Sequence, residues 1–362
     1  MNESLTTCHF HLSLPPLMKD FFIADAARFD NQSITSFFCI ATTSVRDRKG
    51  GGQYLALTLA DKTGQFEARM WDDFADVVLQ CTEGSYVKVQ GQVSKYQGKF
   101  QITLTKMRLA ADSEIDTADF VPTTKFDVAE MNTELRGYVD AFSNHHLRAL
   151  VLAFLDDPLI GPAFVTAPAA KRLHHAWIGG LLEHVLMLVR VCRATLPFYP
   201  EVDPDLLVAG AILHDIGKVR ELSWRSNFNY TLEGQLIGHI SIAQGMLHEK
   251  IAGLNAQAIA AAESSETAPD LFPDRLRMLL EHMILSHHGK LEFGSPKLPM
   301  TPEAMLLSAL DDLEAKFQTL RTEFAASKAA GKSAEDTTEW VRSMDRALFN
   351  SQEYLAAEVE ES

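Results

Sequence analysis

The chain has 362 residues, of which 46% are hydrophobic and 22% are charged, as is typical of a soluble globular protein large enough for two domains. Its net charge of −15 argues against nucleic-acid binding by the chain as a whole. No apolar run reaches the ~20 residues of a membrane span, and no basic stretch followed by an apolar one opens the sequence, so we expect neither a membrane segment nor a secretory signal. The four cysteines contain no C-x-x-C pair, which is typical of reduced thiols in a cytoplasmic protein.

Residues 20–110 have the alternating apolar and polar pattern of short β-strands. In QYLALTLAD (residues 53–61) the leucines fall on one face. The stretches QFEARMW, SYVKVQGQVSKY and KFQITLTKMRL follow, with turns at DKTG and at Gln97–Gly98. The helix-like stretch WDDFADVVLQ lies between the third and fourth strands, where an OB-fold barrel carries its helix. We therefore predict a five-stranded OB-fold β-barrel; the alternative is a small sheet that serves packing or dimerisation.

After residue 132 the apolar residues recur with the helical period of 3.6, which predicts an all-α bundle. The predicted fold class is thus a multidomain α+β protein, with Met18 as an alternative start to Met1. We expect a closing helix around Trp340–Ala357. The expected segments are an N-terminal extension at 1–19, the barrel at 20–110, a linker at 111–132, the helical domain at 133–325, and a low-complexity loop with a helical tail at 326–362.

Charge is unevenly distributed along the chain. Residues 41–110 carry ten lysines and arginines against seven aspartates and glutamates, a local charge of +3. OB-fold barrels bind single strands through basic grooves and through aromatic side chains on which bases stack. Aromatic residues lie on the predicted strands, but Phe66 and Trp71 have opposite parities and cannot both face one side. We predict that the residues contacting a nucleic-acid strand are Arg69, Lys95, Tyr96 and Lys99.

A series of histidines and aspartates lies in apolar helical sequence, spread over several predicted helices and helix ends. Its members, in chain order, are His184, His214, Asp215, His239, His287, His288 and Asp311. Burying an unpaired polar group costs roughly 2–7 kcal/mol, so these groups either satisfy one another or hold a cation. Imidazole together with carboxylate suits Mn, Fe, Co, Ni or Zn better than Mg or Ca. Asp311 is preferred to Asp312 because it shares a helical face with Leu307 and Ala315.

This order of residues (H, HD, H, HH, D) resembles the HD-domain metal-dependent phosphohydrolases, in the subset whose extra histidines bind a second metal. The resemblance implies that four residues bind one divalent ion, namely His184, His214, Asp215 and Asp311. It implies that a second ion is bound by His239, His287 and His288, with Asp215 bridging the two. We therefore expect two transition-metal ions per chain, with Mn²⁺ as the first choice and Co²⁺, Fe²⁺ or Ni²⁺ as alternatives, and Asp215 as a catalytic residue.

Two further residues are candidates for catalysis. Lys218 follows His214 by four residues on the predicted helix and either meets a substrate phosphate or interacts with the helix C-terminus. His175 precedes the first metal-ligating helix and either contacts phosphate and protonates the leaving group, or acts indirectly or in solvent. Arg172 is a similar but weaker candidate.

An OB-fold barrel followed by an HD domain that opens with HHAWIGGLLEH (residues 174–184) is similar to the YhaM-type 3′-to-5′ exoribonucleases over residues 20–320. The resemblance implies metal-dependent release of nucleoside 5′-monophosphates from the 3′ end of single-stranded RNA, and of single-stranded DNA as a further substrate. We also expect a cytoplasmic homo-oligomer with no membrane partner. Two alternatives stay open: a phosphohydrolase of a small nucleotide or cyclic dinucleotide with a regulatory barrel, and a non-catalytic RNA-binding scaffold.

Overall fold

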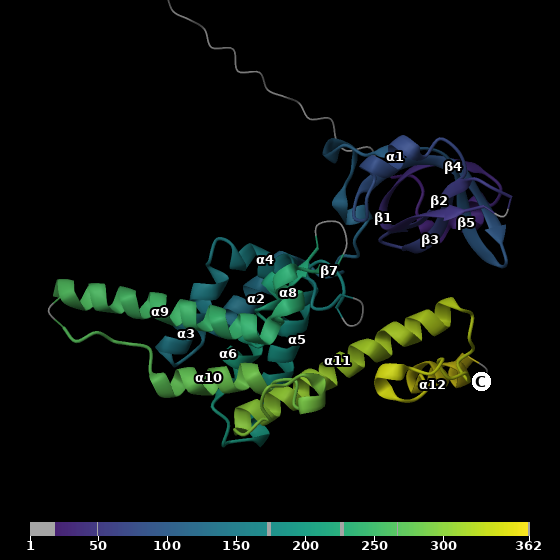
Figure 1. Cartoon of the computed structure of the whole chain (residues 1–362). Coiled ribbons are helices and arrows are strands. Elements are labelled where there is room, and N and C mark those ends of the chain that lie inside the picture. Colours follow the sequence, from purple (N-terminus) through teal and green to yellow (C-terminus); the bar gives the residue numbers. More distant parts are fainter. Residues whose placement is uncertain (1–18, 49, 172–174, 225–227, 266, 361–362) are drawn as a thin grey trace, which may run out of the picture. The chain divides into compact units, whose positions relative to one another are not determined.

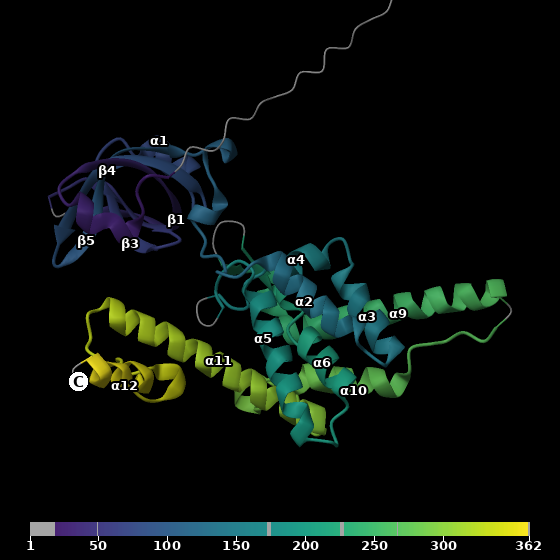
Figure 2. The ribbon, with the colours of Figure 1, turned by 180° about the vertical axis from the view of Figure 1, so that it is seen from behind.

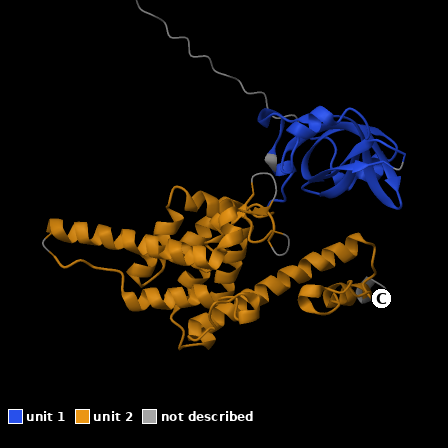
Figure 3. Cartoon of the chain, in the orientation of Figure 1, with its two compact units in different colours: residues 1–123, 225–227 blue, residues 124–224, 228–362 orange. Residues whose placement is uncertain are grey.

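The structure is a computed structural model that describes residues 19–360 except for residues 49, 172–174, 225–227 and 266. The described chain forms two compact units, which divide between Thr123 and Thr124, inside the predicted linker (Figure 3). Residues 1–18 of the predicted N-terminal extension, including Met18, and Arg172 lie outside the described residues. Each unit is described by itself below.

The first unit is a closed barrel of five strands, which confirms the predicted fold (Figure 1). Neighbouring strands follow the order β1-β2-β3-β5-β4, and all pairs are antiparallel except β3 with β5. The short helix lies between the third and fourth strands, as predicted. The elements are the 3₁₀ helix η1 (Ile23–Phe29), β1 (Ser33–Asp47), β2 (Gln53–Asp61), β3 (Gly64–Met70), α1 (Ala75–Gln80), β4 (Tyr86–Tyr96) and β5 (Lys99–Leu109).

The alternation of the strands decides which side chains fill the barrel. The leucines of β2 are buried, and Phe66 of β3 packs on Phe38 with ring centroids 5.4 Å apart. Trp71 has the opposite parity, lies on the outer side and stacks on Tyr54 at 4.7 Å. The outer faces of β2 and β3 are therefore free to present polar and aromatic side chains to a ligand.

A buried ion pair closes one end of the barrel. The Nζ atom of Lys19 lies 2.7 Å from Asp61 Oδ2 and donates to the Phe37 carbonyl at 2.7 Å. Asp61 also accepts hydrogen bonds from the backbone of Ile23 at 2.9 Å and of Thr63 at 2.8 Å. Burial lowers the pKa of Lys19 to about 8, against the pull of Asp61. Lys19 is thus an integral part of the barrel, although the predicted boundaries place it in the extension.

We expect Lys19→Ala to destabilise the barrel by about 3–5 kcal/mol, because it leaves the Asp61 carboxylate buried without its cation. Urea unfolding, followed by the tryptophan fluorescence of the barrel, measures this change in the free energy of unfolding. The matched control is Lys62→Ala, which removes an exposed lysine that pairs with Asp119 at 2.8 Å and is expected to cost less than about 1 kcal/mol. Equal losses of unfolding free energy in the two variants would contradict a stabilising role for the buried ion pair.

The second unit is helical, as predicted, apart from a two-stranded sheet that the sequence pattern did not indicate. Its helices are α2 (Val128–Asp140), α3 (His145–Leu155), α4 (Ile160–Thr166), α5 (Gly180–Thr195), α6 (Pro204–Leu213), α7 (Lys218–Glu221), α8 (Leu232–Leu236), α9 (His239–Ser265), α10 (Asp274–Ser286), α11 (Pro302–Ala329) and α12 (Ser351–Glu360). The small sheet consists of β6 (Leu222–Ser223) and β7 (Asn229–Tyr230). In the part of the chain described, no single helix is long and apolar enough to cross a membrane, and only the bent pair α3 and α4 passes on length and composition.

Helix α6 is the centre of this unit. It is apolar all round, and Leu206–Leu213 are buried by packing on α3, α5, α10 and α11. Its start is fixed by the Asp203 side chain, which accepts from the Leu206 amide, and by Pro204 in the first turn. Helices α9 and α10 pack on each other, and both views show them diverging toward the C-terminal end of α9 (Figure 1 and Figure 2). The C-terminal end of α6 therefore lies in the middle of the helical unit.

The C-terminal part differs from the sequence expectation. Helix α11 continues to Ala329, into the segment predicted as a low-complexity loop. The closing helix begins at Ser351, not near Trp340, because Val341 pairs with Arg346 in an isolated bridge. Helical periodicity alone does not reveal such a bridge.

Candidate functional site

Seven residues with metal-ligating side chains converge from five places in the helical unit. They are His184 within α5, His214 and Asp215 in the turn after α6, His239 at the start of α9, His287 and His288 after α10, and Asp311 in α11. The turn after α6 is possible because of Gly217, where a Cβ atom would lie 2.1 Å from the His239 carbonyl oxygen. Glycine at this position lets the turn and the start of α9 approach closely.

One group of ligand atoms lies around His184 and His214. The distance from His184 Nε2 to Asp311 Oδ1 is 3.2 Å, and from His214 Nε2 to Asp215 Oδ2 it is also 3.2 Å. The two Nε2 atoms are 3.4 Å apart. Ligands that share one ion at about 2.1 Å lie about 3–3.5 Å from one another, so these spacings match a common cation.

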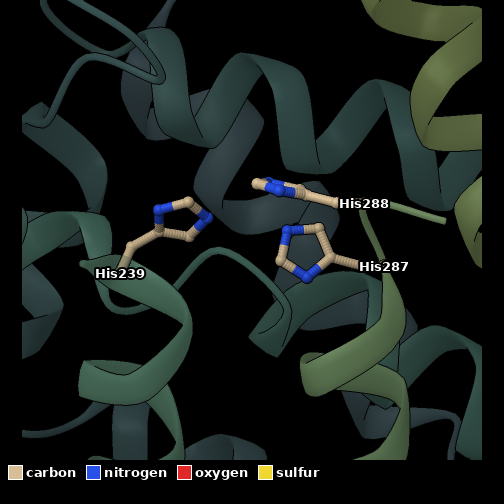
Figure 4. Close-up of side chains that lie close together, drawn as sticks. All are labelled: His239, His287 and His288. Atoms are coloured by element: carbon tan, nitrogen blue, oxygen red, sulfur yellow. The ribbon is translucent and has the colours of Figure 1, made fainter. Parts of the chain in front are cut away.

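A second group lies on the other side of Asp215. Its Oδ1 atom is 3.5 Å from His239 Nε2 and 3.7 Å from His287 Nε2. His288 completes this group, in which the ligand atoms of the three histidines all lie within 4.8 Å of one another. Figure 4 shows the three imidazole rings meeting from two separate segments of the chain. The two oxygens of Asp215 thus face different groups.

Three buried atoms of this site have no hydrogen-bond partner among the described residues: Asp215 Oδ1, His239 Nε2 and His287 Nε2. Leaving a buried polar atom unpaired costs about 1–3 kcal/mol, and here three such atoms point into the same space. A divalent cation satisfies carboxylate oxygens and imidazole nitrogens together. The donor set therefore fits a metal ion better than it fits a self-contained hydrogen-bond network.

The other nitrogen of every histidine in the site has a partner. Each Nδ1 atom donates to an oxygen at 2.8–3.0 Å. Because these oxygens can only accept, each Nδ1 carries a hydrogen, and each Nε2 is the nitrogen left to bind a cation. The acceptors are the carbonyls of Ala211 for His214, Ile284 for His287 and Phe293 for His288, and the carboxylates of Glu314 for His184 and Glu221 for His239.

Sequence reasoning missed the two glutamates. A signal existed for Glu314, which follows Asp311 by three residues and shares its helical face. We find no corresponding signal for Glu221, because its contact with His239 depends on how α7 and α9 pack.

Electrostatics also prepare the site for a cation. Burial would raise the pKa of Asp215, but the charges of Lys218 and His214 hold it well below its usual range. Burial lowers the pKa of His287 well below its usual value, so this ring stays neutral. Burial opposes charge on His184, but Asp311 and Glu314 raise its pKa to about 10. A proton on His184 therefore balances the carboxylates until a cation displaces it.

The structure corrects the sequence interpretation of Lys218. Residues 214–217 form a turn, and Lys218 begins α7, so it does not lie on a continuous helix with His214. Its Nζ atom is 2.6 Å from Asp215 Oδ2. It therefore orients and neutralises that carboxylate, and its predicted interaction with the C-terminus of α6 stays a prediction.

His175 is joined to the site through Glu314. It is 2% exposed, and its Nε2 atom donates to Glu314 Oε1 at 2.9 Å. Its contact with a substrate phosphate stays a prediction. Of the two adjacent aspartates, Asp311 joins the site, whereas the side chain of Asp312 is 55% exposed and pairs with Lys316.

The barrel has a groove of about 790 Å³ on its surface. Three of the four residues predicted to bind nucleic acid line it, namely Arg69, Tyr96 and Lys99. The Arg69 guanidinium lies 5.6 Å from the centroid of the Tyr96 ring, which is half exposed. Lys95 does not line this groove; its ammonium lies 5.4 Å from the Phe100 ring.

A second aromatic platform, not among the predicted contacts, is the stacked pair of Tyr54 and Trp71. The Arg48 guanidinium lies 5.3 Å from the centroid of the Trp71 ring. The outward parity of Trp71 was the signal that could have identified it.

Comparison with known families assigns both units. Residues 42–110 match the OB-fold nucleic acid binding domain, and residues 181–316 match the HD domain. The chain thus combines an OB-fold nucleic-acid-binding domain with an HD phosphohydrolase domain whose His/Asp clusters could hold divalent metal.

Solved structures similar to the chain include replication protein A. One chain of a replication protein A heterotrimer bound to ssDNA is 26% identical to this chain. The match covers 22% of this chain and 58% of that chain, with a TM-score of 0.19. The second OB-fold domain of replication protein A from Methanococcus maripaludis is 24% identical over 22% of this chain and 85% of its own, with a TM-score of 0.19. This chain therefore spans little more than half of the heterotrimer chain that it matches.

Proposed function

We propose that the protein is a metal-dependent 3′-to-5′ exoribonuclease that releases nucleoside 5′-monophosphates from single-stranded RNA and accepts single-stranded DNA as a further substrate. The observation that carries the proposal is the convergence of Asp215 Oδ1, His239 Nε2 and His287 Nε2, buried and without hydrogen-bond partners. The nucleic-acid-binding domain beside an HD domain supports a polynucleotide as the substrate. A small-nucleotide hydrolase would need the same His/Asp cluster but would have no use for the groove on the barrel.

The two groups of ligands define two ion positions in this proposal. One ion would be held by His184, His214, Asp215 and Asp311, and the other by His239, His287 and His288. Asp215 would serve both, because its Oδ2 atom faces the first group and its Oδ1 atom the second. The donor set, with imidazoles in the majority, suits first-row transition metals, and we propose Mn²⁺, with Co²⁺, Fe²⁺ and Ni²⁺ as alternatives.

When bound, two such ions activate water at neutral pH and neutralise charge on the attacking and leaving oxygens of an in-line displacement at phosphorus. Asp215 holds its position through the hydrogen bond from Lys218. Lys218 also brings a positive charge next to the cluster, where it would attract the scissile phosphate. Glu221 and the three backbone carbonyls keep the histidine rings from rotating, so the site needs little reorganisation when substrate arrives.

In this proposal, the barrel would bind the single-stranded RNA. The segment at 41–110 carries a charge of +3, which leaves −18 for the rest of the chain, so the attraction for phosphates is concentrated there. In the groove, Tyr96 offers a ring for a base, and Arg69 and Lys99 offer charges for the backbone. Lys95 would add charge from outside the groove.

Metal removal tests the proposal. Protein stripped with a chelator and reloaded with Mn²⁺ is expected to bind two ions per chain by elemental analysis, and to hydrolyse bis-p-nitrophenyl phosphate only after reloading. Saturation at 100 times the dissociation constant is expected to stabilise the helical unit by about 2.7 kcal/mol for each ion. Hydrolysis that survives complete removal of metal, or a limit of one ion per chain at saturating Mn²⁺, would contradict the two-ion site.

A further inference from the structure

A buried line of three side chains lies behind the first group of ligands. Glu314 accepts a hydrogen bond from His175 Nε2 on Oε1 at 2.9 Å and from His184 Nδ1 on Oε2, also at 2.9 Å. All three side chains are buried, with exposures of 2% for both histidines and 6% for the glutamate. One carboxylate therefore joins two imidazoles, only one of which reaches the ligand cluster.

The fold builds this line from three separate segments. Glu314 lies one turn after Asp311 in α11, and His184 lies in α5. His175 precedes α5 and has a φ of 52°, a conformation that residues other than glycine rarely adopt. Its carbonyl accepts from the backbone of Ala169 at 3.1 Å and of Trp177 at 2.9 Å, which holds this conformation. Side chains held in such backbone geometry are characteristic of functional sites.

A second carboxylate lies near the far side of His175, whose buried Nδ1 atom has no hydrogen-bond partner among the described residues. Glu183 Oε1 lies 3.7 Å from His175 Nδ1. Glu183 Oε2 accepts from Thr124 Oγ1 at 2.6 Å and from Trp177 Nε1 at 2.7 Å. The His175 ring therefore lies between two carboxylates, and its one hydrogen bond goes to Glu314.

We propose that Glu314 and His175 are positioning residues for His184, an inference that rests on the proposed metal site. The Glu314 carboxylate fixes the hydrogen of His184 on Nδ1 and makes Nε2 a stronger donor to a cation. His175 occupies the other oxygen of Glu314 and keeps it from turning away. The neutral carbonyls behind His214 and His287 fix orientation but supply no such charge.

The variant Glu314→Gln tests this role in the full chain. We expect it to weaken one of the two Mn²⁺ binding steps by about 10- to 100-fold in a calorimetric titration and to leave the other step unchanged. In protein loaded with diamagnetic Zn²⁺, ¹⁵N NMR of the His184 ring is expected to show a weaker Nδ1–H hydrogen bond than in wild type. The matched control is Glu303→Gln, which changes another buried glutamate of α11 whose carboxylate accepts from the Asp203 backbone. This control is expected to match wild type in both measurements.

The outcomes separate this proposal from the metal site itself. Wild-type protein that binds no Mn²⁺ would overturn both. Wild-type protein that binds two ions, together with a Glu314→Gln variant of unchanged affinity and unchanged His184 Nδ1–H signal, would overturn the positioning role alone. If Glu314→Gln does not fold, His175→Ala carries the same test: weakening of the same binding step supports the proposal, and unchanged affinity overturns it.

Discussion

Replacing Asp215 by asparagine is expected to slow phosphodiester hydrolysis by about 1000-fold or more, the largest effect of any single substitution in this protein. The two carboxylate oxygens face the two groups of ligands, and an amide offers one neutral oxygen in their place. Bound Mn²⁺ should fall from two ions to at most one. Steady-state hydrolysis of bis-p-nitrophenyl phosphate and elemental analysis of the same sample measure both effects.

The matched control is Asp312→Asn, which removes an exposed carboxylate that lies beside Asp311 in α11. It is expected to keep wild-type activity and metal content. Circular dichroism must show that both variants keep the helical content of wild type. Wild-type activity in a folded Asp215→Asn protein would rule out the metal site described above.

The second large effect is expected on the barrel. Tyr96→Ala should weaken binding of single-stranded RNA by about 5- to 150-fold, because stacking of one base contributes about 1–3 kcal/mol. Adding Arg69→Ala and Lys99→Ala should weaken it further and reduce the slope of affinity against salt concentration. The KM for long RNA should rise accordingly, whereas hydrolysis of bis-p-nitrophenyl phosphate should not change, since that substrate does not need the groove.

Lys106→Ala is the control for loss of charge alone. Lys106 is exposed on the same barrel but does not line the groove. Its removal should change RNA affinity much less than removal of Tyr96. If both variants bind RNA as wild type does, the barrel serves regulation or dimerisation, and a small-nucleotide substrate becomes the better proposal.

The sequence predicted the barrel because its strands alternate cleanly. The leucines of β2 and the opposite parities of Phe66 and Trp71 assign the inner and outer faces without any tertiary information. Three of the four residues predicted to bind nucleic acid line the same groove for the same reason. Lys95 was assigned from charge alone; it pairs with Phe100, which lines the groove, but Lys95 itself does not line it.

The order of histidines and aspartates likewise predicted which residues would converge, but not what surrounds them. Glu314 shares the helical face of Asp311, but it is 130 residues from His184 along the chain, so its hydrogen bond to that ring depends on how α5 and α11 pack. Lys218 was predicted on the same continuous helix as His214, and this prediction fails because of tertiary packing. The packing of Gly217 on the His239 carbonyl accompanies a turn where the periodicity suggested a continuous helix.

The most direct test of the proposed function uses single-stranded RNA labelled at either end, incubated with purified protein and Mn²⁺. We predict that 5′-labelled RNA shortens one nucleotide at a time. RNA labelled within its 3′-terminal nucleotide should release that label at once as a nucleoside 5′-monophosphate. The Asp215→Asn variant should produce neither result. Internal cuts, release of the 5′ label first, or intact RNA alongside rapid hydrolysis of a small nucleotide would contradict the assignment as a 3′-to-5′ exoribonuclease.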